Sequence, residues 1–303
     1  MHIPPPPTER NQPLRGLLHQ YTPRLAAFEY STSPDIKPHT LLFVGGLNDG
    51  LGTVSYLTDL ISALEESDWS VFAPVLSSSS TGGQDVLQYI SSCNPRNSHS
   101  HPQDHNETPM PTLRPKVDGA IMQAPVSDRQ AIQWVLREGT KRHTAAELQR
   151  IYNHGIEFAQ KHLFEDHTSL DTIVLLSVTT ALGYPASTAI SSRRFLSLSS
   201  PDSPRSPSDE DLFSSDLSDE RLKKTFGIIS HRGVLKDKLL VLYSGSDPYV
   251  PPEVDKGALM ERWRRSGIIP GPTHTLEGRG QEGQRMVLVQ KVARFLNDIE
   301  NGP

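Results

Sequence analysis

Short apolar runs alternate with segments of helical periodicity along most of this chain. Runs of strand length, rich in Leu, Val, Ile and aromatic residues, predict buried strands. They lie at Leu17–Tyr21, Leu25–Tyr30, Thr40–Val44, Trp69–Leu76, Val117–Val126 and Lys238–Tyr243. Thr40–Val44 is apolar almost throughout, which is typical of a parallel strand that is covered on both faces.

Apolar residues at a spacing of three and four predict helices between these strands. One such stripe is Val54, Leu57, Leu60, Ile61 and Leu64, and a second near the C-terminus is Met286, Val289, Val292, Ala293 and Leu296. Residues 128–190 are mainly helical by the same criterion. We therefore expect an α/β fold with a mostly parallel sheet, helices on both faces and a helical insertion that forms a cap.

Two segments interrupt this alternation. Residues 94–115 are rich in Pro, Ser, Asn and His, and residues 191–220 are dominated by Ser, Pro and Asp. Such compositions bury too little apolar surface to order a segment. The expected organisation is a first part of the core at 1–127, a cap at 128–230 containing a disordered linker at 191–220, and a second part of the core at 231–303.

Composition narrows the cellular setting. The chain has 303 residues and a formal net charge of −5, which gives no electrostatic case for nucleic-acid binding. The first residues lack the basic and apolar regions of a secretion signal, and no apolar run approaches the roughly 20 residues that span a bilayer. Cys93 is the single cysteine, so no intramolecular disulfide can form. We expect a cytoplasmic protein without membrane partners.

The first candidate for chemistry is Ser80, which follows the strand Trp69–Leu76 and precedes the apolar residues 86–90. A serine on a tight turn between strand and helix projects its Oγ above the sheet, and the N–H of the next residue, Thr81, points at a developing oxyanion. Gly82 fits the G-x-S-x-G pattern of such turns, whereas Ser78 stands where that pattern has glycine. A serine-rich turn is also typical of an ordinary loop.

Asp247 and His274 complete a possible triad. Asp247 lies in a Gly/Pro turn directly after the strand Lys238–Tyr243, and His274 lies in a short loop before the last helix. The order Ser80, Asp247, His274 is the order of α/β-hydrolases and differs from those of chymotrypsin and subtilisin. Each residue has a structural alternative, because Asp247 also suits a turn before Pro248 and the chain has 12 histidines.

The glycine-rich loop after Thr40–Val44 is the expected second half of an oxyanion hole. In a hydrolase this loop donates a backbone N–H, here from Gly46 or Leu47. The spacing of its glycines does not match the G-x-G-x-x-G pattern of dinucleotide binding. His99, His101 and His105 lack a carboxylate or cysteine framework for a metal, so we expect neither a metal nor another cofactor.

Several segments together resemble the fungal and plant α/β-hydrolases of the DUF1749 family. They are residues 41–50, 80–86, 114–129, 244–247 and 249–251. The family's best-understood members are fungal intracellular siderophore esterases that act on fusarinine C and related hydroxamates. The resemblance implies Ser80 as nucleophile, Asp247 as acid, His274 as base, and Gly46 or Leu47 with Thr81 as oxyanion donors.

One departure from the family pattern precedes the nucleophile. The family has a further segment between the strand end at Leu76 and the serine, which supplies a helix, a strand and a Gly-His pair. This chain lacks that segment, and Ser78-Ser79 stands in place of the Gly-His pair. Neighbouring parallel strands need a crossover of about a dozen residues. Either one strand must therefore serve two positions, or the sheet lacks a strand beside its active site.

These observations lead to two alternative functions. The first is a serine esterase that hydrolyses a small-molecule ester of the hydroxamate siderophore class inside the cell, with iron arriving only as part of the substrate. The second is a catalytically impaired hydrolase-like binding protein or mis-spliced product, which the missing crossover favours.

Overall fold

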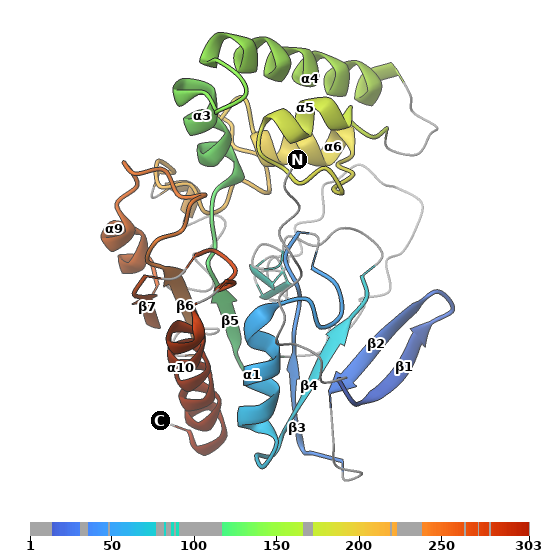
Figure 1. Cartoon of the computed structure of the whole chain (residues 1–303), viewed down its shortest axis with the longest axis vertical. Coiled ribbons are helices and arrows are strands. Elements are labelled where there is room, and N and C mark those ends of the chain that lie inside the picture. Colours follow the sequence, from blue (N-terminus) through green and yellow to red (C-terminus); the bar gives the residue numbers. More distant parts are fainter. Residues whose placement is uncertain are drawn as a thin grey trace.

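The protein is described from a computed structural model (Figure 1). It describes residues 14–30, 36–47, 49–76, 82, 86–87, 89–90, 117–165, 172–218, 220–222, 238–263, 265–271, 273–278 and 280–302. Its strands are β1 (Leu17–Thr22), β2 (Leu25–Tyr30), β3 (His39–Leu42), β4 (Trp69–Pro74), β5 (Ala120–Gln123), β6 (Leu239–Ser244) and β7 (Arg265–Ile269). The expected strands are thus present, some with shorter bounds, and β7 is an addition that sequence analysis did not predict.

The described helices lie between and after these strands, with four of them in succession between β5 and β6. They are α1 (Ser55–Leu64), α3 (Asp128–Glu138), α4 (Ala145–Glu165), α5 (Leu176–Ala181), α6 (Ser192–Ser199), α9 (Lys256–Glu261) and α10 (Glu282–Asn301). Most of the two predicted stripes is buried, including Leu57 and Leu60 of α1 and Val289 and Val292 of α10, whereas Met286 at the start of the second stripe is exposed.

The described strands form two sheets. One has the order β1-β2-β4-β3, in which β1, β2 and β4 pair antiparallel and β3 pairs parallel with β4. The other has the order β5-β6-β7 and is parallel throughout. Within the part of the chain that the structure describes, no strand pairs with the second edge of β3 or of β5.

This division falls where the sequence lacks a crossover. Strand β3 was expected to be central, yet Leu42 at its end is 58% exposed. A strand placed between β3 and β5 would join the two sheets into one. The described residues therefore fit the expectation that the sheet lacks a strand beside the candidate active site.

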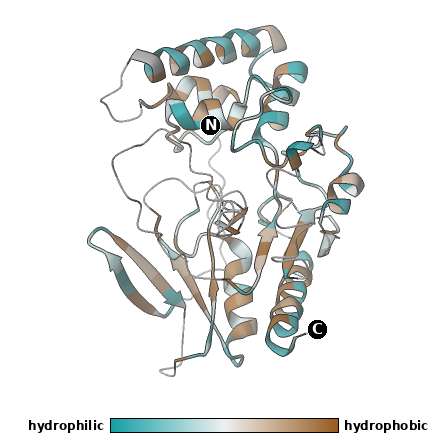
Figure 2. Ribbon diagram, turned by 180° about the vertical axis from the view of Figure 1, so that it is seen from behind, coloured by the Kyte–Doolittle hydropathy of each residue, from teal (hydrophilic) through white to brown (hydrophobic). Residues whose placement is uncertain are grey.

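Packing of α1 against α10 holds the two sheets together. One hydrophobic cluster includes Leu57 and Val71 from the first half, Leu242 and Ile269 from the second, and Leu288 of α10. An ion pair between Arg285 Nε and Asp59 Oδ2, 2.7 Å apart, adds a polar contact between the two helices. In Figure 2 helix α1 is largely hydrophobic, as this shared core requires.

Helices cover both faces of the second sheet. Leu242 of β6 faces α1 and α10, whereas its neighbours Val241 and Tyr243 face a separate cluster. That cluster includes Leu87 and Ile90, which follow Ser80 by seven and ten positions. Because side chains alternate along a strand, β6 is buried on both sides.

Helices α3, α4, α5 and α6 pack together as a cap beyond the sheets (Figure 1). Phe195 of α6 and Ala159 of α4 are fully buried in this cluster. The helical region expected at 128–190 is therefore present, although α6 extends it into the segment expected to be a linker.

The expectation of a disordered linker at 191–220 is wrong for its described residues. Arg129 of α3 is buried, and its Nε donates to Asp211 Oδ2 at 2.8 Å while its Nη1 donates to Asp216 Oδ2 at 3.0 Å. Ser203 and Ser214 also donate to Asp211. Composition missed this segment because a buried ion pair, together with Leu212 and Phe213, supplies the order that its few apolar residues do not suggest.

We expect the missing segment to be worth several degrees of thermal stability. Restoring the family's segment between Ser79 and Ser80 gives both open strand edges a partner, and one kcal/mol shifts the midpoint of a chain of this size by roughly 2–4 °C. Thermal unfolding of the two chains should differ by more than about 5 °C. Equal midpoints would show that the sheet closes without the segment.

We also expect Arg129→Ala to be strongly destabilising. Its removal leaves the buried Asp211 carboxylate without its cation, a change that typically costs about 3–5 kcal/mol. Arg137→Ala is the matched control, because Arg137 makes ion pairs with Glu138 and Glu253 on the exposed surface. Denaturant unfolding should separate the two variants, and similar midpoints would contradict a structural role for Arg129.

Candidate active site

Asp247 lies in the turn that follows β6. Its side chain is buried, and Oδ1 accepts a hydrogen bond from the backbone N–H of Tyr249 at 3.0 Å. This hydrogen bond within the turn sets the orientation of the carboxylate and hence the position of its other oxygen, Oδ2. An aspartate at the carboxyl end of a buried strand is held with little freedom.

His274 meets Asp247 from the loop between β7 and α10. Its Nδ1 lies 2.7 Å from Asp247 Oδ2. Since an ionised carboxylate only accepts, Nδ1 carries the proton of this bond, and Nε2 of the neutral ring is left as an acceptor. The side chain of His274 is 30% exposed, so the ring is only partly shielded from solvent.

Side chains from three directions contact the His274 loop. Gln123 Nε2, at the end of β5, donates to the carbonyl of His274 at 2.8 Å. Ser55 Oγ, at the start of α1, donates to the carbonyl of Thr275 at 2.9 Å. The ring of Tyr249 stands edge-on to the ring of His274, with centroids 5.1 Å apart. Both halves of the molecule therefore position this histidine.

The Gly45–Leu47 loop follows β3, as the sequence predicts. The N–H of Gly46 donates to Asp49 Oδ2 at 2.7 Å, and the N–H of Asp49 donates back to the Gly46 carbonyl at 3.1 Å. Among the described residues, none accepts a hydrogen bond from the N–H of Leu47. Of the two predicted oxyanion donors in this loop, Gly46 is thus already engaged.

Gly82 packs against the same loop. Its φ of +54° is left-handed, and a Cβ there would lie 3.3 Å from the Gly45 oxygen and 3.4 Å from the Gly46 Cα. The N–H of Val86, the first of the described helical residues after Gly82, donates to the Gly82 carbonyl at 3.0 Å. Ser80 and Thr81 lie outside the described residues, as do His99, His101 and His105.

Two further carboxyl groups near His274 were not predicted. Loss of water around Asp128 raises its pKa, and the Tyr184 O–H, which donates to it at 3.0 Å, and the charge of His274 lower it by less. Desolvation also raises the pKa of Asp49. The hydrogen bond from the Gly46 N–H and the charge of His274 lower that pKa by less. In the sequence, Asp128 stands at the start of a predicted helix and Asp49 follows a predicted strand, and these positions were the available signal for the two groups.

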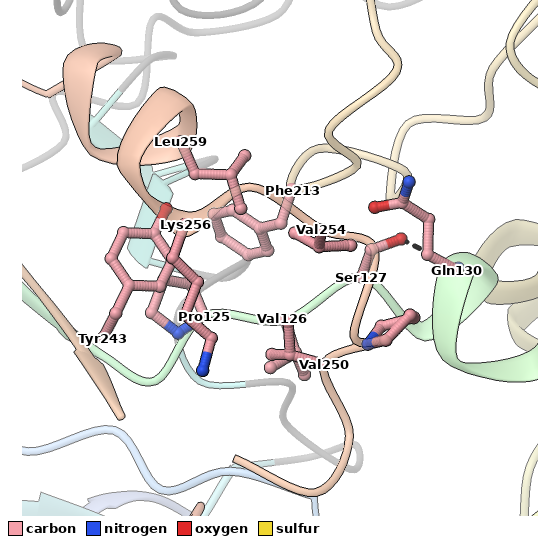
Figure 3. A pocket seen from close by; sticks show the side chains of 11 residues that line it. Pro125, Val126, Ser127, Gln130, Phe213, Tyr243, Val250, Val254, Lys256 and Leu259 are labelled. Atoms are coloured by element: carbon pink, nitrogen blue, oxygen red, sulfur yellow. Dashed lines mark hydrogen bonds between the residues drawn. The ribbon is translucent and has the colours of Figure 1, made fainter. Parts of the chain in front are cut away.

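A small cavity lies beside the end of β6 (Figure 3). Val126, Phe213, Tyr243 and Val250 are among its lining residues, and its volume of about 10 Å³ is near the minimum for one water molecule. Lys256 Nζ donates to the carbonyls of Ser244 and Gly245 at 2.9 and 2.8 Å, so the ammonium ties α9 to the turn before Asp247. This cavity is too small for an ester substrate. The described residues contain no cluster of His, Cys, Asp or Glu suited to a metal ion.

Comparison with known families decides the relationship. A family model described as a protein of unknown function, DUF1749, matches residues 1–80 and 79–297. The chain belongs to this family. The match divides at Ser79–Ser80, where the expected segment is missing.

Two curated relatives extend over almost the whole chain. One is named Esterase AN6793, from Emericella nidulans, and is 53% identical over 370 aligned positions that cover all of this chain and 97% of the relative. The other is named fusarinine C esterase, from Aspergillus fumigatus, and is 42% identical, covering 94% of this chain and 96% of the relative. Since the first alignment exceeds the 303 residues of this chain, the relative has positions that this chain lacks.

A solved structure gives the same result. The siderophore hydrolase EstB of Aspergillus fumigatus is 41% identical and superposes with a TM-score of 0.79, over 96% of this chain and 99% of that one. The family member described here thus has the α/β-hydrolase fold that its sequence predicts. None of the helices in the described ranges is long and apolar enough to cross a membrane.

We expect Gly82→Ala to destabilise the contact between Gly82 and the Gly45–Gly46 loop. A left-handed conformation costs a residue with a Cβ about 1–2 kcal/mol, and the contact with the Gly45 oxygen adds to that cost. Gly280→Ala is the matched control, because Gly280 has a φ of +81° but nothing within 4 Å of the added Cβ. Denaturant unfolding should show a larger loss for Gly82→Ala, and equal losses would mean that the contact contributes nothing.

Proposed function

We propose that this chain is a serine esterase that hydrolyses ester bonds of hydroxamate siderophores. The observation that carries the proposal is the Asp247–His274 pair, 2.7 Å apart, which leaves His274 Nε2 as an acceptor. This is the arrangement that a base needs to take the proton of a serine hydroxyl.

The position of Gly82 supports Ser80 as the nucleophile. Two peptide units separate the two residues, and such a stretch spans at most about 7 Å. Since Gly82 contacts the Gly45–Gly46 backbone, the sequence allows Ser80 to reach the loop that carries the oxyanion donor. No other serine in the family resemblance occupies this place.

The proposed reaction is acyl transfer in two steps. His274 Nε2 takes the proton of Ser80 as Oγ attacks the ester carbonyl, and backbone N–H groups of Thr81 and the Gly45–Leu47 loop stabilise the oxyanion. His274 then donates that proton to the departing alcohol. Water, activated by the same ring, releases the acyl group from Ser80.

The substrate class is inferred from the relatives. Two of them carry names that specify siderophore or fusarinine C hydrolysis, at 41% and 42% identity. Fungal siderophores of this class join hydroxamate units through esters, which is the bond that the proposed triad cleaves. We place this reaction in the cytoplasm on the strength of the sequence, and iron takes part only as cargo of the substrate.

A second candidate is a hydrolase-like binding protein with impaired catalysis, or a mis-spliced product. The divided sheet and the divided family match both favour it. The missing strand would lead directly to Ser80, and a displacement of about 1 Å at a reacting group can cost ~100-fold in rate. Sequencing the transcript around the codons for Ser77–Ser80 distinguishes a spliced variant from a genuine deletion.

We expect Ser80→Ala to abolish the esterase activity of this chain. Triad members act as a unit, so turnover of a p-nitrophenyl ester and of fusarinine C should fall by at least about 10³-fold. Ser79→Ala is the matched control, with one hydroxyl removed from the same turn, and should keep its activity. Turnover that persists in Ser80→Ala would exclude this nucleophile, and wild-type turnover equal to that of Ser80→Ala would establish the impaired alternative.

A further inference from the structure

Asp49 folds back over the loop that the proposed function assigns to the oxyanion. Its Oδ2 accepts from the Gly46 N–H at 2.7 Å, and its own N–H donates to the Gly46 carbonyl. A Cβ added at Gly45 would lie 2.8 Å from the Asp49 Cβ, and one added at Gly46 would lie 3.1 Å from Asp49 Oδ2. The Asp49 side chain therefore leaves no room for a Cβ at Gly45 and only a tight fit for one at Gly46.

Gly82 approaches this backbone independently of Asp49. The atoms nearest to its added Cβ are the Gly45 oxygen, the Gly46 Cα and the Gly45 carbonyl carbon, whereas those nearest to the Gly45 and Gly46 Cβ positions belong to Asp49. Contacts from both Gly82 and Asp49 thus restrict one short stretch of backbone. Such a loop keeps its N–H directions without reorganising when charge develops, which is the condition for oxyanion stabilisation.

We propose that Asp49 is a positioning residue that fixes the Gly45–Leu47 loop and leaves the Leu47 N–H as its oxyanion donor. This inference rests on the proposed function. Gly46 cannot serve while its N–H is bonded to Asp49. Leu47 is the neighbouring residue in the same loop, and no described residue accepts from its N–H.

The charge of Asp49 is separable from its hydrogen bond. The carboxyl interacts with the charge of His274. Burial raises the pKa of Tyr56, and the charge of Asp49 raises it further. An asparagine keeps an oxygen that accepts from Gly46 but carries no charge, whereas an alanine removes both. Comparing the two variants therefore isolates the hydrogen bond.

The test measures covalent labelling of Ser80 by a fluorophosphonate, followed by intact mass spectrometry over hours. This reaction develops negative charge on a phosphoryl oxygen in the same place and detects slow sites. We expect Asp49→Ala to lower the maximal labelling rate about 10- to 100-fold, with the half-saturating concentration changed less than about twofold. Asp49→Asn should restore the rate to within about threefold.

Two controls separate the possible outcomes. Glu138→Ala removes another carboxylate, an exposed one at the end of α3, and should label at the wild-type rate with only its ion pair to Arg137 lost. Ser80→Ala should not be labelled. Wild-type protein that is never labelled at Ser80 would overturn the proposed function. Labelling of Ser80 that is equally fast in Asp49→Ala, or equally slow in Asp49→Asn and Asp49→Ala, would overturn the role of Asp49 alone.

Discussion

The packing of α1 against α10 is the contact on which the rest of this molecule depends. It joins a sheet that carries the Gly45–Leu47 loop to a sheet that carries Asp247, with the His274 loop beside it. In an uninterrupted parallel sheet the intervening strand would make this connection through hydrogen bonds. Here apolar side chains, the Arg285–Asp59 pair and the Ser55 bond to the His274 loop make it instead. Apolar contacts are less directional than a strand ladder, so they define the separation of the two halves less sharply.

The residues of the proposed chemistry are distributed over the two halves of the molecule. The second half contains the acid and the base on one rigid sheet edge, and their 2.7 Å contact lies within that half. The first half contains the oxyanion loop, fixed by Asp49 and contacted by Gly82. Ser80 connects the halves in sequence, at the point where the relatives have additional residues. The proposed catalysis therefore depends on how Ser80 is placed without the segment that precedes it in the relatives.

The cap shows a different use of polar residues. Arg129 is buried, with Asp211 and Asp216 as partners and Ser203 and Ser214 around Asp211. Breaking such a network is costly because each unpaired charge would remain away from water. This ties a Ser- and Pro-rich segment to α3 beside Phe213, which lines the cavity at the end of β6. A segment whose composition suggests a linker is thus ordered by a buried charge and its hydrogen-bond partners.

The sequence by itself predicted most of the strands and helices, identified the family and indicated Ser80, Asp247 and His274 as the candidate triad. Apolar runs and helical stripes identified β2, β6, α1 and α10, because strand and helix periodicities are local properties. The order of Ser80, Asp247 and His274, with their places after strands, indicated the triad. It also revealed the missing crossover, since a parallel connection has a minimum length.

Only the tertiary structure decided which residues that are distant in sequence come into contact. The ordering of residues 200–218 depends on Arg129, some 80 positions away, and β7 becomes a strand because β6 offers its edge. The raised pKa of Asp128 arises from desolvation among residues distant in sequence, which no local pattern encodes. Pairing, burial and charge coupling are properties of the assembled chain, because each requires groups distant in sequence to be brought within a few ångströms.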